Sequence, residues 1–437
     1  MNRLRRAVAN LAYGCLFIIA FPWLIWRRFT GKSRRGWRQK YCGLARGELQ
    51  LNSATKDQPT VWLHAVSVGE VNLLLPMIES LASRATIVIS TTTETGYDLA
   101  QDKYRQFSVF FFPFDFTWSV RRTLRSVAPD LVVLAELEIW PNLISIAHQE
   151  NIPIVVANGR LSESSFRTYR KFRWLTQTPF QQLTHVAAQN ETYAGRFIEA
   201  GCYPENVTVT GSIKFDNAQL DPENSLTKEL AEMAGLDDDA FLFVAGSTQL
   251  VEDILVAEVF LQLKPKYPQL HVVLVPRHPE RCPQLYQELK RLGIDFVIRS
   301  ELQNSSVKPI DFLVVDVIGE LGGWWGRANV GYVGGTMDRR EGQNMIEPAA
   351  YGVPVCFGPR YKNFRDVVEQ LLAVEGAEVI HDAEGLSSFV LRCLTQPEVM
   401  QTMGTRAADV VYKNRGATEK TISILETLVP ELRRMER

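Results

Sequence analysis

The chain has 437 residues, which at about 150 residues per domain predicts two to three domains. Hydrophobic residues make up 46% of it and charged residues 22%, which excludes a disordered or fibrous protein. The formal net charge is −1, but residues 1–46 carry eleven Lys or Arg and no Asp or Glu, so the other 391 residues sum to −12. A basic N-terminal segment on an acidic body indicates attachment to an anionic surface and disfavours a general nucleic-acid binder.

The N-terminal region contains twenty consecutive uncharged residues, 7–26. As a helix this run has a length of about 30 Å, which matches the hydrocarbon core of a bilayer. Three positive charges precede the run and eight follow it by residue 46, an imbalance that places the body of the protein on the cytoplasmic side. We therefore predict a membrane anchor and basic flank over 1–46. Because Pro22 and Asn10 weaken a spanning helix, a helix lying flat in the interface is the alternative.

The rest of the sequence alternates short apolar runs with helix-length amphipathic segments, the pattern of a doubly wound parallel sheet. A polar stretch at 216–239 interrupts the alternation. We predict two Rossmann-like α/β domains, 47–215 and 240–420, joined by a linker at 216–239. Ligands bind at the carboxyl ends of the strands in such sheets, so a cleft between facing domains is the expected site. The runs predicted as strands are 61–65, 87–90, 109–112, 131–134, 154–157, 241–244, 272–275, 312–315 and 330–333.

Glu70 closes the loop that follows the first predicted strand, and Gly69 before it allows the backbone to turn. A carboxylate at the carboxyl end of a strand can act as a general base toward an acceptor hydroxyl. Near a helix N-terminus it can equally serve as a cap that complements the helix dipole. Both interpretations remain open at this point.

A second pair of acids, Glu136 and Glu138, ends the predicted strand 131–134. Their spacing of two residues places both carboxylates on one face, where buried acids need a partner or a task. Lys214, near the end of the first predicted domain, is the candidate cationic partner. An ordinary ion pair explains the same residues equally well.

The second predicted domain carries the features of a nucleotide-sugar site. Arg277 follows the strand 272–275, where a guanidinium can clamp a phosphate. A glycine-rich stretch from 334 precedes a helix predicted to start near Asn344, whose amides then point at an anion, with Glu347 one turn in to accept from sugar hydroxyls. Tight packing alone can also explain the glycines.

No metal and no cofactor is predicted. The six cysteines are scattered without C-x-x-C spacing, as expected of a chain in a reducing compartment. The P-loop pattern, the G-x-S-x-G elbow and H-E-x-x-H are absent from the sequence. Asp237, Asp238 and Asp239 lie in the predicted linker rather than at a strand end.

Five motifs recur in order in one enzyme family, at residues 64–70, 136–143, 158–162, 276–281 and 343–347. They resemble the 3-deoxy-D-manno-octulosonic acid (Kdo) transferases of lipopolysaccharide synthesis. The likeness covers almost the whole chain, including the N-terminal anchor. It implies a GT-B glycosyltransferase of two Rossmann-like domains, with no metal and with a final helix, here 421–437, that packs back on the first domain. The implied reaction moves Kdo from CMP-Kdo onto the lipid A precursor (lipid IVA) at the cytoplasmic face of the inner membrane, whose anionic lipids the basic flank contacts.

The resemblance also implies roles for particular residues. Glu70 matches the catalytic base of the family, and Glu136 and Lys214 match the pair that stabilises the transition state. The positions that match the CMP-binding segments are Pro276, Arg277, Ile318, Gly319, Glu320, Asn344, Met345, Ile346 and Glu347.

Three departures from the family pattern stand out. Met345-Ile346 replaces a run that usually contains proline, Gln249-Leu250-Val251 replaces a loop with histidine or tryptophan and glycine, and Gly159 stands where alanine is usual. The altered loop at 249–251 leaves details of donor or acceptor binding open. The alternative functions are a GT-B transferase that uses a UDP-sugar and a lipid-linked acceptor, a nucleotide-sugar epimerase, and a non-catalytic sugar-binding protein.

Overall fold

The computed structural model describes residues 35–49, 58–237, 239–302, 309–338 and 342–433. The predicted membrane anchor at 7–26 lies outside these residues. Within the described ranges, none of the helices combines the length and apolarity needed to cross a bilayer. The chain divides into two compact units, one of Met1–Asn217 with Arg415–Arg437 and the other of Ala218–Asn414.

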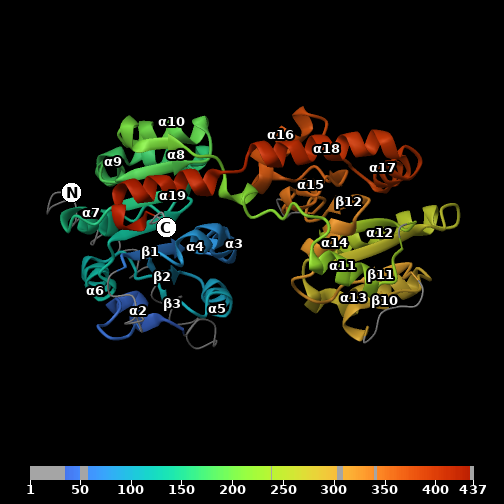
Figure 1. Ribbon diagram of the computed structural model, residues 1–437, viewed down its shortest axis with the longest axis horizontal. Coiled ribbons are helices and arrows are strands. Elements are labelled where there is room, and N and C mark those ends of the chain that lie inside the picture. Colours follow the sequence, from blue (N-terminus) through green and yellow to red (C-terminus); the bar gives the residue numbers. More distant parts are fainter. Residues whose placement is uncertain (1–34, 50–57, 238, 303–308, 339–341, 434–437) are drawn as a thin grey trace. The chain divides into compact units, whose positions relative to one another are not determined.

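The first unit is built on a seven-stranded parallel sheet with the order β3-β2-β1-β4-β5-β6-β7 (Figure 1). Its central strands are apolar on both faces because helices cover both sides, as in doubly wound folds. The strands are β1 Thr60–Ala65, β2 Thr86–Thr91, β3 Ser108–Phe111, β4 Leu131–Ala135, β5 Ile154–Gly159, β6 His185–Ala188 and β7 Val207–Val209.

Alternate strand residues point into two separate cores. In β1, Trp62 packs with one core, whereas Val61 and Leu63 pack with the other. The first core is closed by α6 Thr117–Val127, α7 Pro141–Gln149, α8 Glu163–Lys171, α9 Arg173–Gln181 and α10 Glu191–Ala200. The second is closed by α3 Val68–Leu73, α4 Leu75–Leu81, α5 Glu94–Lys103 and the C-terminal α19 Ala417–Leu428.

The chain returns to the first unit at its C-terminal end. Helix α19 packs against α4 and β5, and its first turn is held because Asp216 accepts hydrogen bonds from the backbone N–H of Gly416 (2.8 Å) and Thr418 (2.6 Å). The sequence predicts this helix to begin at residue 421, four residues later than the structure has it.

The second unit repeats the architecture with a parallel sheet in the order β10-β11-β9-β8-β12-β13-β14. Its strands are β8 Phe241–Thr248, β9 Leu270–Pro276, β10 Val297–Ile298, β11 Phe312–Val314, β12 Val330–Val333, β13 Val355–Phe357 and β14 Ala377–Val379. Its helices are α11 Ser225–Met233, α12 Leu250–Leu263, α13 Cys282–Arg291, α14 Leu321–Arg327, α15 Ile346–Ala350, α16 Arg365–Ala373, α17 Ala383–Thr395 and α18 Pro397–Lys413.

The stretch predicted to be a linker, 216–239, contains the helix α11 and belongs largely to the second unit. Asn224 caps this helix by accepting from the N–H of Thr227, and Thr227 in turn donates to the carbonyl of Gly323 in α14 (3.1 Å). A side chain at Gly326 would collide with Thr227, so the two helices approach closely. The polar composition of the stretch predicts a linker, whereas the structure has a helix there that packs against α14.

Candidate active site

Glu70 lies one turn into α3, directly after the carboxyl end of β1. Its carboxylate folds back over the start of the helix and accepts hydrogen bonds from the backbone N–H of Val66 (2.8 Å) and the hydroxyl of Ser67 (3.3 Å). These bonds tie the carboxylate to the loop that precedes α3, and no side-chain capping hydrogen bond is present at the N-cap residue Ser67. These bonds account for only part of its environment, because the group is also close to other charges.

Burial raises the pKa of Glu70 to about 7. The Val66 N–H opposes this effect, the negative charge of Glu136 reinforces it, and Ser67 and the positive charge of Lys214 lower the pKa again. A carboxyl group with a pKa near the working pH is both available as a base at neutral pH and strong enough to accept a proton. This electrostatic setting is what a simple helix cap lacks.

Glu136 and Lys214 form the predicted ion pair, with 3.1 Å between Nζ and Oε1. Glu136 follows β4 in the left-handed backbone region, at φ 55°, and its N–H donates to the carbonyl of Ala157 (2.9 Å). Lys214 lies in a short turn, Ile213–Phe215, beyond β7. Residues from two distant parts of the sequence thus meet near Glu70.

Asn158, in β5, holds the turn that carries Lys214. This fully buried residue, at φ 56°, accepts from the N–H of Ile213 through its Oδ1 (3.0 Å), while its backbone carbonyl accepts from Gln189 (3.0 Å). Sequence reasoning placed Asn158 in a family motif without giving it a role. A substitution here would disturb the position of Lys214 through the turn.

Glu138 and His64 complete the polar cluster. Burial, with the charges of Glu70 and Glu136, raises the pKa of Glu138 to about 8, and Trp140 partly offsets this. Burial lowers the pKa of His64 to about 3, so its ring is neutral; it stacks on Phe112 and lies 3.9 Å from Glu138. The sequence predicted Glu138 as the neighbour of Glu136 but did not connect either acid with His64.

The carboxyl edge of the second sheet is organised by Glu252, which sequence reasoning missed. This fully buried carboxylate accepts from the N–H groups of Gln249 (2.8 Å), Gly335 (2.7 Å), Thr336 (2.8 Å) and Met337 (3.0 Å), and from the hydroxyl of Tyr332 (3.0 Å). It fixes the glycine loop after β12 to the start of α12. The Gln249…Glu252 spacing is that of a capping box, which the structure forms and which could have signalled it.

The altered loop at 249–251 therefore has a defined structural role. Gln249 caps α12 reciprocally with Glu252, and Val251 is exposed. Thr248, before the cap, accepts at its carbonyl from the N–H of Arg277 (3.0 Å) and the guanidinium of Arg281 (3.0 Å). These hydrogen bonds connect the carboxyl ends of β8, β9 and β12 to one another.

The helix predicted to start near Asn344 begins at Ile346, two residues later, and has only five residues. The reason is local: Asn344 Oδ1 accepts from the N–H of Ile346 (3.1 Å) and thereby uses the amide expected to face a ligand. Its Nδ2 donates to Glu347 (3.0 Å). Burial raises the pKa of Glu347, an effect opposed by Asn344, the charge of Arg277 and Trp325.

The other predicted donor-site residues differ in their exposure to solvent. Arg277 is exposed, whereas Pro276, Met345 and Ile346 are buried. Ile318 has an exposed fraction of 89%, and Gly319 adopts φ 101°. Glu320 is engaged by the Arg299 guanidinium at 2.7 Å and 3.0 Å.

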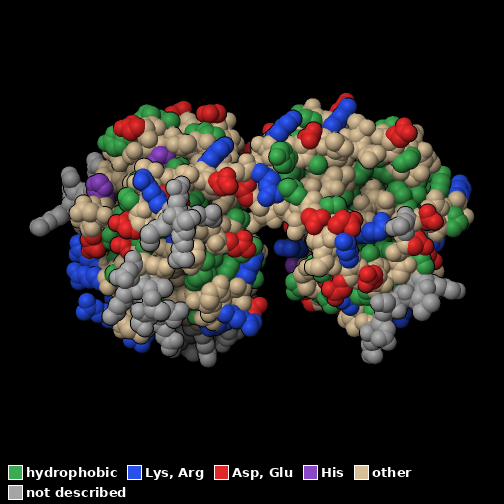
Figure 2. Space-filling model, viewed as in Figure 1, with side chains coloured by type: hydrophobic (Ala, Val, Ile, Leu, Met, Phe, Trp, Pro, Cys, Tyr) green, Lys and Arg blue, Asp and Glu red, His purple; other side chains and the backbone are tan. Residues whose placement is uncertain are grey.

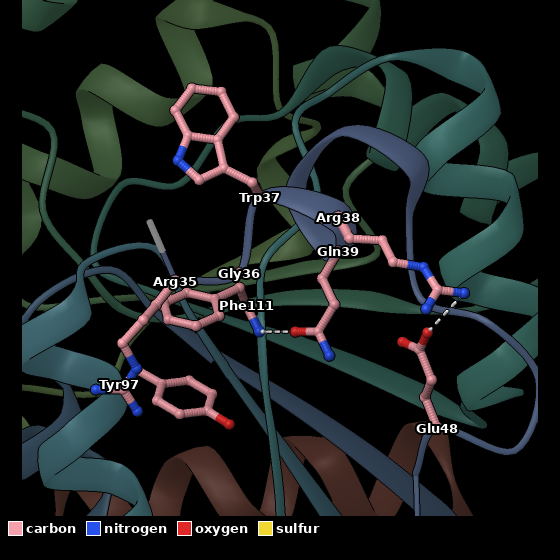
Figure 3. A pocket seen from close by; sticks show the side chains of 8 residues that line it. All are labelled: Arg35, Gly36, Trp37, Arg38, Gln39, Glu48, Tyr97 and Phe111. Carbon is pink, nitrogen blue, oxygen red and sulfur yellow. Dashed lines mark hydrogen bonds and ion pairs between the residues drawn. The ribbon is translucent and has the colours of Figure 1, made fainter. Parts of the chain in front are cut away.

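A cavity of about 450 Å³ lies elsewhere in the first unit, beside α2 Trp37–Cys42 (Figure 3). Two arginines line it, but Arg35 pairs with Asp98 and Arg38 pairs with Glu48 at 3.5 Å. Gln39 accepts from the backbone of Phe111 (3.0 Å) across the same cavity. None of its lining residues belongs to the carboxylate cluster around Glu70, so the cavity is separate from the candidate active site.

Solved structures of similar architecture define the class. A UDP-GlcNAc 2-epimerase from Neisseria meningitidis bound to UDP-GlcNAc matches 84% of the chain and all of that protein, with a TM-score of 0.58 and 12% identity. A glycosyltransferase from Rickettsia africae matches 85% of the chain and 99% of that protein, with a TM-score of 0.55 and 11% identity. At such low identity these matches show the fold alone. Two parallel α/β domains of this kind make up the GT-B class.

Sequence comparisons identify the family within that class. Residues 35–217 match the family model described as 3-deoxy-D-manno-octulosonic-acid transferase (kdotransferase). A Kdo transferase of Haemophilus influenzae is 33% identical over 86% of the chain and 88% of that protein, and one of Bordetella pertussis is 32% identical over 96% and 99%. The chain belongs to the Kdo transferase family. It is a glycosyltransferase that transfers Kdo in lipopolysaccharide synthesis.

Proposed function

We propose that the chain transfers Kdo from CMP-Kdo to the lipid A precursor lipid IVA, with inversion at the anomeric carbon and with Glu70 as the general base. The observation that carries this proposal is the environment of Glu70: a buried carboxyl group at the end of β1 whose pKa is raised to about 7. Such a group is ionised in a large fraction of molecules at neutral pH and gains a proton readily.

In the proposed reaction Glu70 takes the proton of a glucosamine hydroxyl as its oxygen attacks the anomeric carbon of Kdo. The bond between that carbon and the phosphate oxygen of CMP breaks, and CMP leaves with the electron pair. Because attack and departure occur on opposite faces, the product has inverted configuration. The proton remains on Glu70 until it is released to solvent.

Glu136 and Lys214 support this step through charge. Their 3.1 Å pair places one negative and one positive charge close enough to act on the pKa of Glu70 in opposite directions. We assign them the stabilisation of charge that develops during transfer, with Asn158 positioning the Lys214 turn. Neither group needs to exchange a proton.

The donor is assigned to the carboxyl edge of the second sheet. Arg277 is exposed beside the carboxyl ends of β8, β9 and β12, where its guanidinium can stabilise the phosphate of departing CMP. The other residues of the proposed CMP site are Pro276, Ile318, Gly319, Glu320, Asn344, Met345, Ile346 and Glu347. We further propose that no metal ion takes part, because a leaving group with a single phosphate carries less charge than a diphosphate.

Residues 1–46 serve as the membrane attachment in this proposal, with the two units on the cytoplasmic face of the inner membrane. The uncharged run at 7–26 supplies the anchor, and the basic residues around it contact anionic lipid. A lipid acceptor stays in the bilayer, so an enzyme held at its surface meets the acceptor at high local concentration.

The alternative is a UDP-sugar as donor. The test is to incubate the purified full chain with lipid IVA and either CMP-Kdo, generated in place, or UDP-N-acetylglucosamine, and to record product masses with and without EDTA. We expect one or more Kdo additions, unchanged by EDTA, and no product from the UDP-sugar. Absence of Kdo transfer by the folded protein, or strict dependence on a divalent metal, contradicts the corresponding part of the proposal.

A further inference from the structure

Helix α6 exposes a single basic stripe. Trp118, Arg121, Arg122 and Arg125 are spaced at i, i+3, i+4 and i+7, which places them on one face of the helix. Trp118, Arg122 and Arg125 are exposed and Arg121 is half-buried. The opposite face is buried in the first core through Ser119, Val120, Thr123, Leu124 and Val127.

No acid balances this stripe locally. Neither α6 nor the neighbouring α2 contains Asp or Glu, and the three arginines form no ion pair with any residue that the structure describes. The nearest acid along the chain from α2 is Glu48, which pairs with Arg38. Figure 2 shows Lys and Arg side chains gathered over α6 at the edge of the first unit.

Trp118 adds an apolar element to the charged face. Its indole N–H donates to the carbonyl of Tyr41 (3.0 Å), and its ring stacks on Phe116, yet 56% of the residue is exposed. Because its one polar atom is satisfied, the exposed part is the apolar ring. Tryptophans with this combination are typical of the boundary between water and lipid.

The path of the chain brings this face close to the predicted anchor. Helix α2 is fixed to α6 by the Trp118–Tyr41 bond and by two bonds of Leu44, whose N–H donates to Thr123 (3.0 Å) and whose carbonyl accepts from Ser126 (2.7 Å). The uncharged run ends at residue 26, nine residues before Arg35. A fully extended chain of that length spans about 30 Å at most.

We propose that the α2–α6 face, defined by Trp118, Arg121, Arg122 and Arg125, docks on the surface of a bilayer that contains anionic phospholipid. The inference rests on the proposed membrane attachment and extends it from a tether to a defined orientation of the first unit. Each arginine near an anionic surface strengthens binding by about fivefold, and Trp118 inserts at the headgroup level.

A second basic and aromatic surface, the corner between α8 and α9, provides the internal comparison. Phe172 and Trp174 are exposed there, and Trp174 has an exposed fraction of 57%, nearly the same as Trp118. Unlike the arginines of α6, Arg167 at this corner pairs with Glu163 (2.9 Å) and Arg170 lies over Phe166. The corner is also more than 130 residues from the predicted anchor in sequence.

The test uses an environment-sensitive fluorophore on single cysteines in the full chain. Cys15 and Cys42 are replaced by serine, because the other four cysteines are buried, and Trp118→Cys is compared with Trp174→Cys as the matched control. With vesicles containing phosphatidylglycerol we expect a blue shift and brighter emission at position 118 and no change at 174. Vesicles of phosphatidylcholine alone should give a smaller response at 118.

A charge reversal extends the test to function. Arg122→Glu with Arg125→Glu should abolish the fluorescence response at 118 and lower Kdo transfer to acceptor embedded in anionic vesicles by about tenfold or more, while transfer to detergent-dispersed acceptor stays at the wild-type rate. Arg170→Glu with Arg173→Glu is the control and should change neither.

The outcomes separate this inference from the proposal on which it rests. If the labelled protein floats with vesicles but position 118 does not respond, the α2–α6 face is not the docking surface and the tether stands. A response at 174 instead of 118 assigns docking to the α8–α9 corner and overturns the inference. If the protein does not float with anionic vesicles at all, the membrane attachment itself is wrong.

Discussion

Glu70 in the first unit and Glu252 in the second both follow a parallel strand and lie in the first turn of the next helix. Glu252 is fully buried and surrounded by donors: four backbone N–H groups and the Tyr332 hydroxyl point at it. Glu70 accepts from Val66 and Ser67 and has negative neighbours. The same residue type at the same place in the fold anchors a loop in one unit and is the proposed proton acceptor in the other.

The comparison shows that burial alone does not decide what a carboxylate does. Hydrogen-bond donors that occupy both oxygens of a carboxylate stabilise its charged form and leave no free lone pair for a substrate proton. A buried carboxylate with fewer hydrogen-bond donors and a negative charge nearby has a raised pKa and remains able to accept a proton. Substitutions of Glu70, Glu252, Glu136 and Lys214 each change one of these conditions.

The largest expected effect comes from removing the base. Glu70→Gln should lower kcat for Kdo transfer by about a thousandfold, because the carboxamide keeps the size of the side chain but cannot take a proton. Calorimetric titration with CMP should give the wild-type affinity, since the donor is assigned to the second unit. Glu79→Gln, on the exposed side of α4, is the control and should transfer at the wild-type rate. A Glu70→Gln protein with more than a tenth of wild-type kcat would remove the residue from this role.

The opposite pattern is expected for Glu252→Gln. A carboxamide turns donor hydrogens toward N–H groups that have no other acceptor, so the free energy of unfolding should fall by about 3 kcal/mol. With the glycine loop released, KM for the donor should rise more than kcat falls. Glu258→Gln, on the exposed side of α12, provides the comparison in denaturant titrations. Equal stability of the two variants contradicts the anchoring role of Glu252.

Two substitutions should move the ionisation of Glu70 in opposite directions. The negative charge of Glu136 raises the pKa of Glu70 and the positive charge of Lys214 lowers it. The acid limb of the kcat/KM profile should therefore shift to lower pH in Glu136→Gln and to higher pH in Lys214→Met, whatever the absolute rates. If the acid limb shifted in the same direction in both variants, it would report the ionisation of a group other than Glu70.

The smallest effect is expected where this chain departs from its family at Gly159. A Cβ atom there would lie 3.1–3.2 Å from Val186, the Ala187 carbonyl and Phe197, so neighbours must move by a few tenths of an ångström. This cost opposes the gain from a less flexible unfolded chain. Gly159→Ala should change the free energy of unfolding by less than about 1 kcal/mol in thermal or denaturant melts. A loss above about 2 kcal/mol would show that the packing cannot adjust.

Much of the fold could be predicted because the long central strands carry continuous runs of β-branched and aromatic residues. The nine runs predicted as strands, for example 131–134 and 272–275, all coincide with strands of the two sheets. The strands that the sequence did not reveal, β6, β7, β10, β13 and β14, have two to four residues, too few for a clear pattern. Helix α11 was missed because its polar exposed face dominates its composition.

The candidate site was partly predictable for a different reason. Glu70, Glu136 and Lys214 could be named because each follows a strand or ends a domain, and the structure brings them together. The capping-box spacing could have indicated Glu252 as a cap of α12, but its partners at 332–337 could not be predicted, since they lie about 80 residues away and only the fold brings them to it. The start of the helix near Asn344 was predictable, but the hydrogen bond that the Asn344 side chain accepts from the N–H of Ile346 was not.

The pH dependence of kcat/KM for the wild-type protein tests the central claim most directly. With Glu70 as the base, the rate should fall on the acid side with an apparent pKa of about 7, because burial raises the pKa of this carboxyl and its protonated form cannot accept the substrate proton. A profile that stays flat down to pH about 5 would mean that Glu70 ionises like an exposed carboxylate or takes no part in proton transfer. Either result would contradict the contrast between the two glutamates.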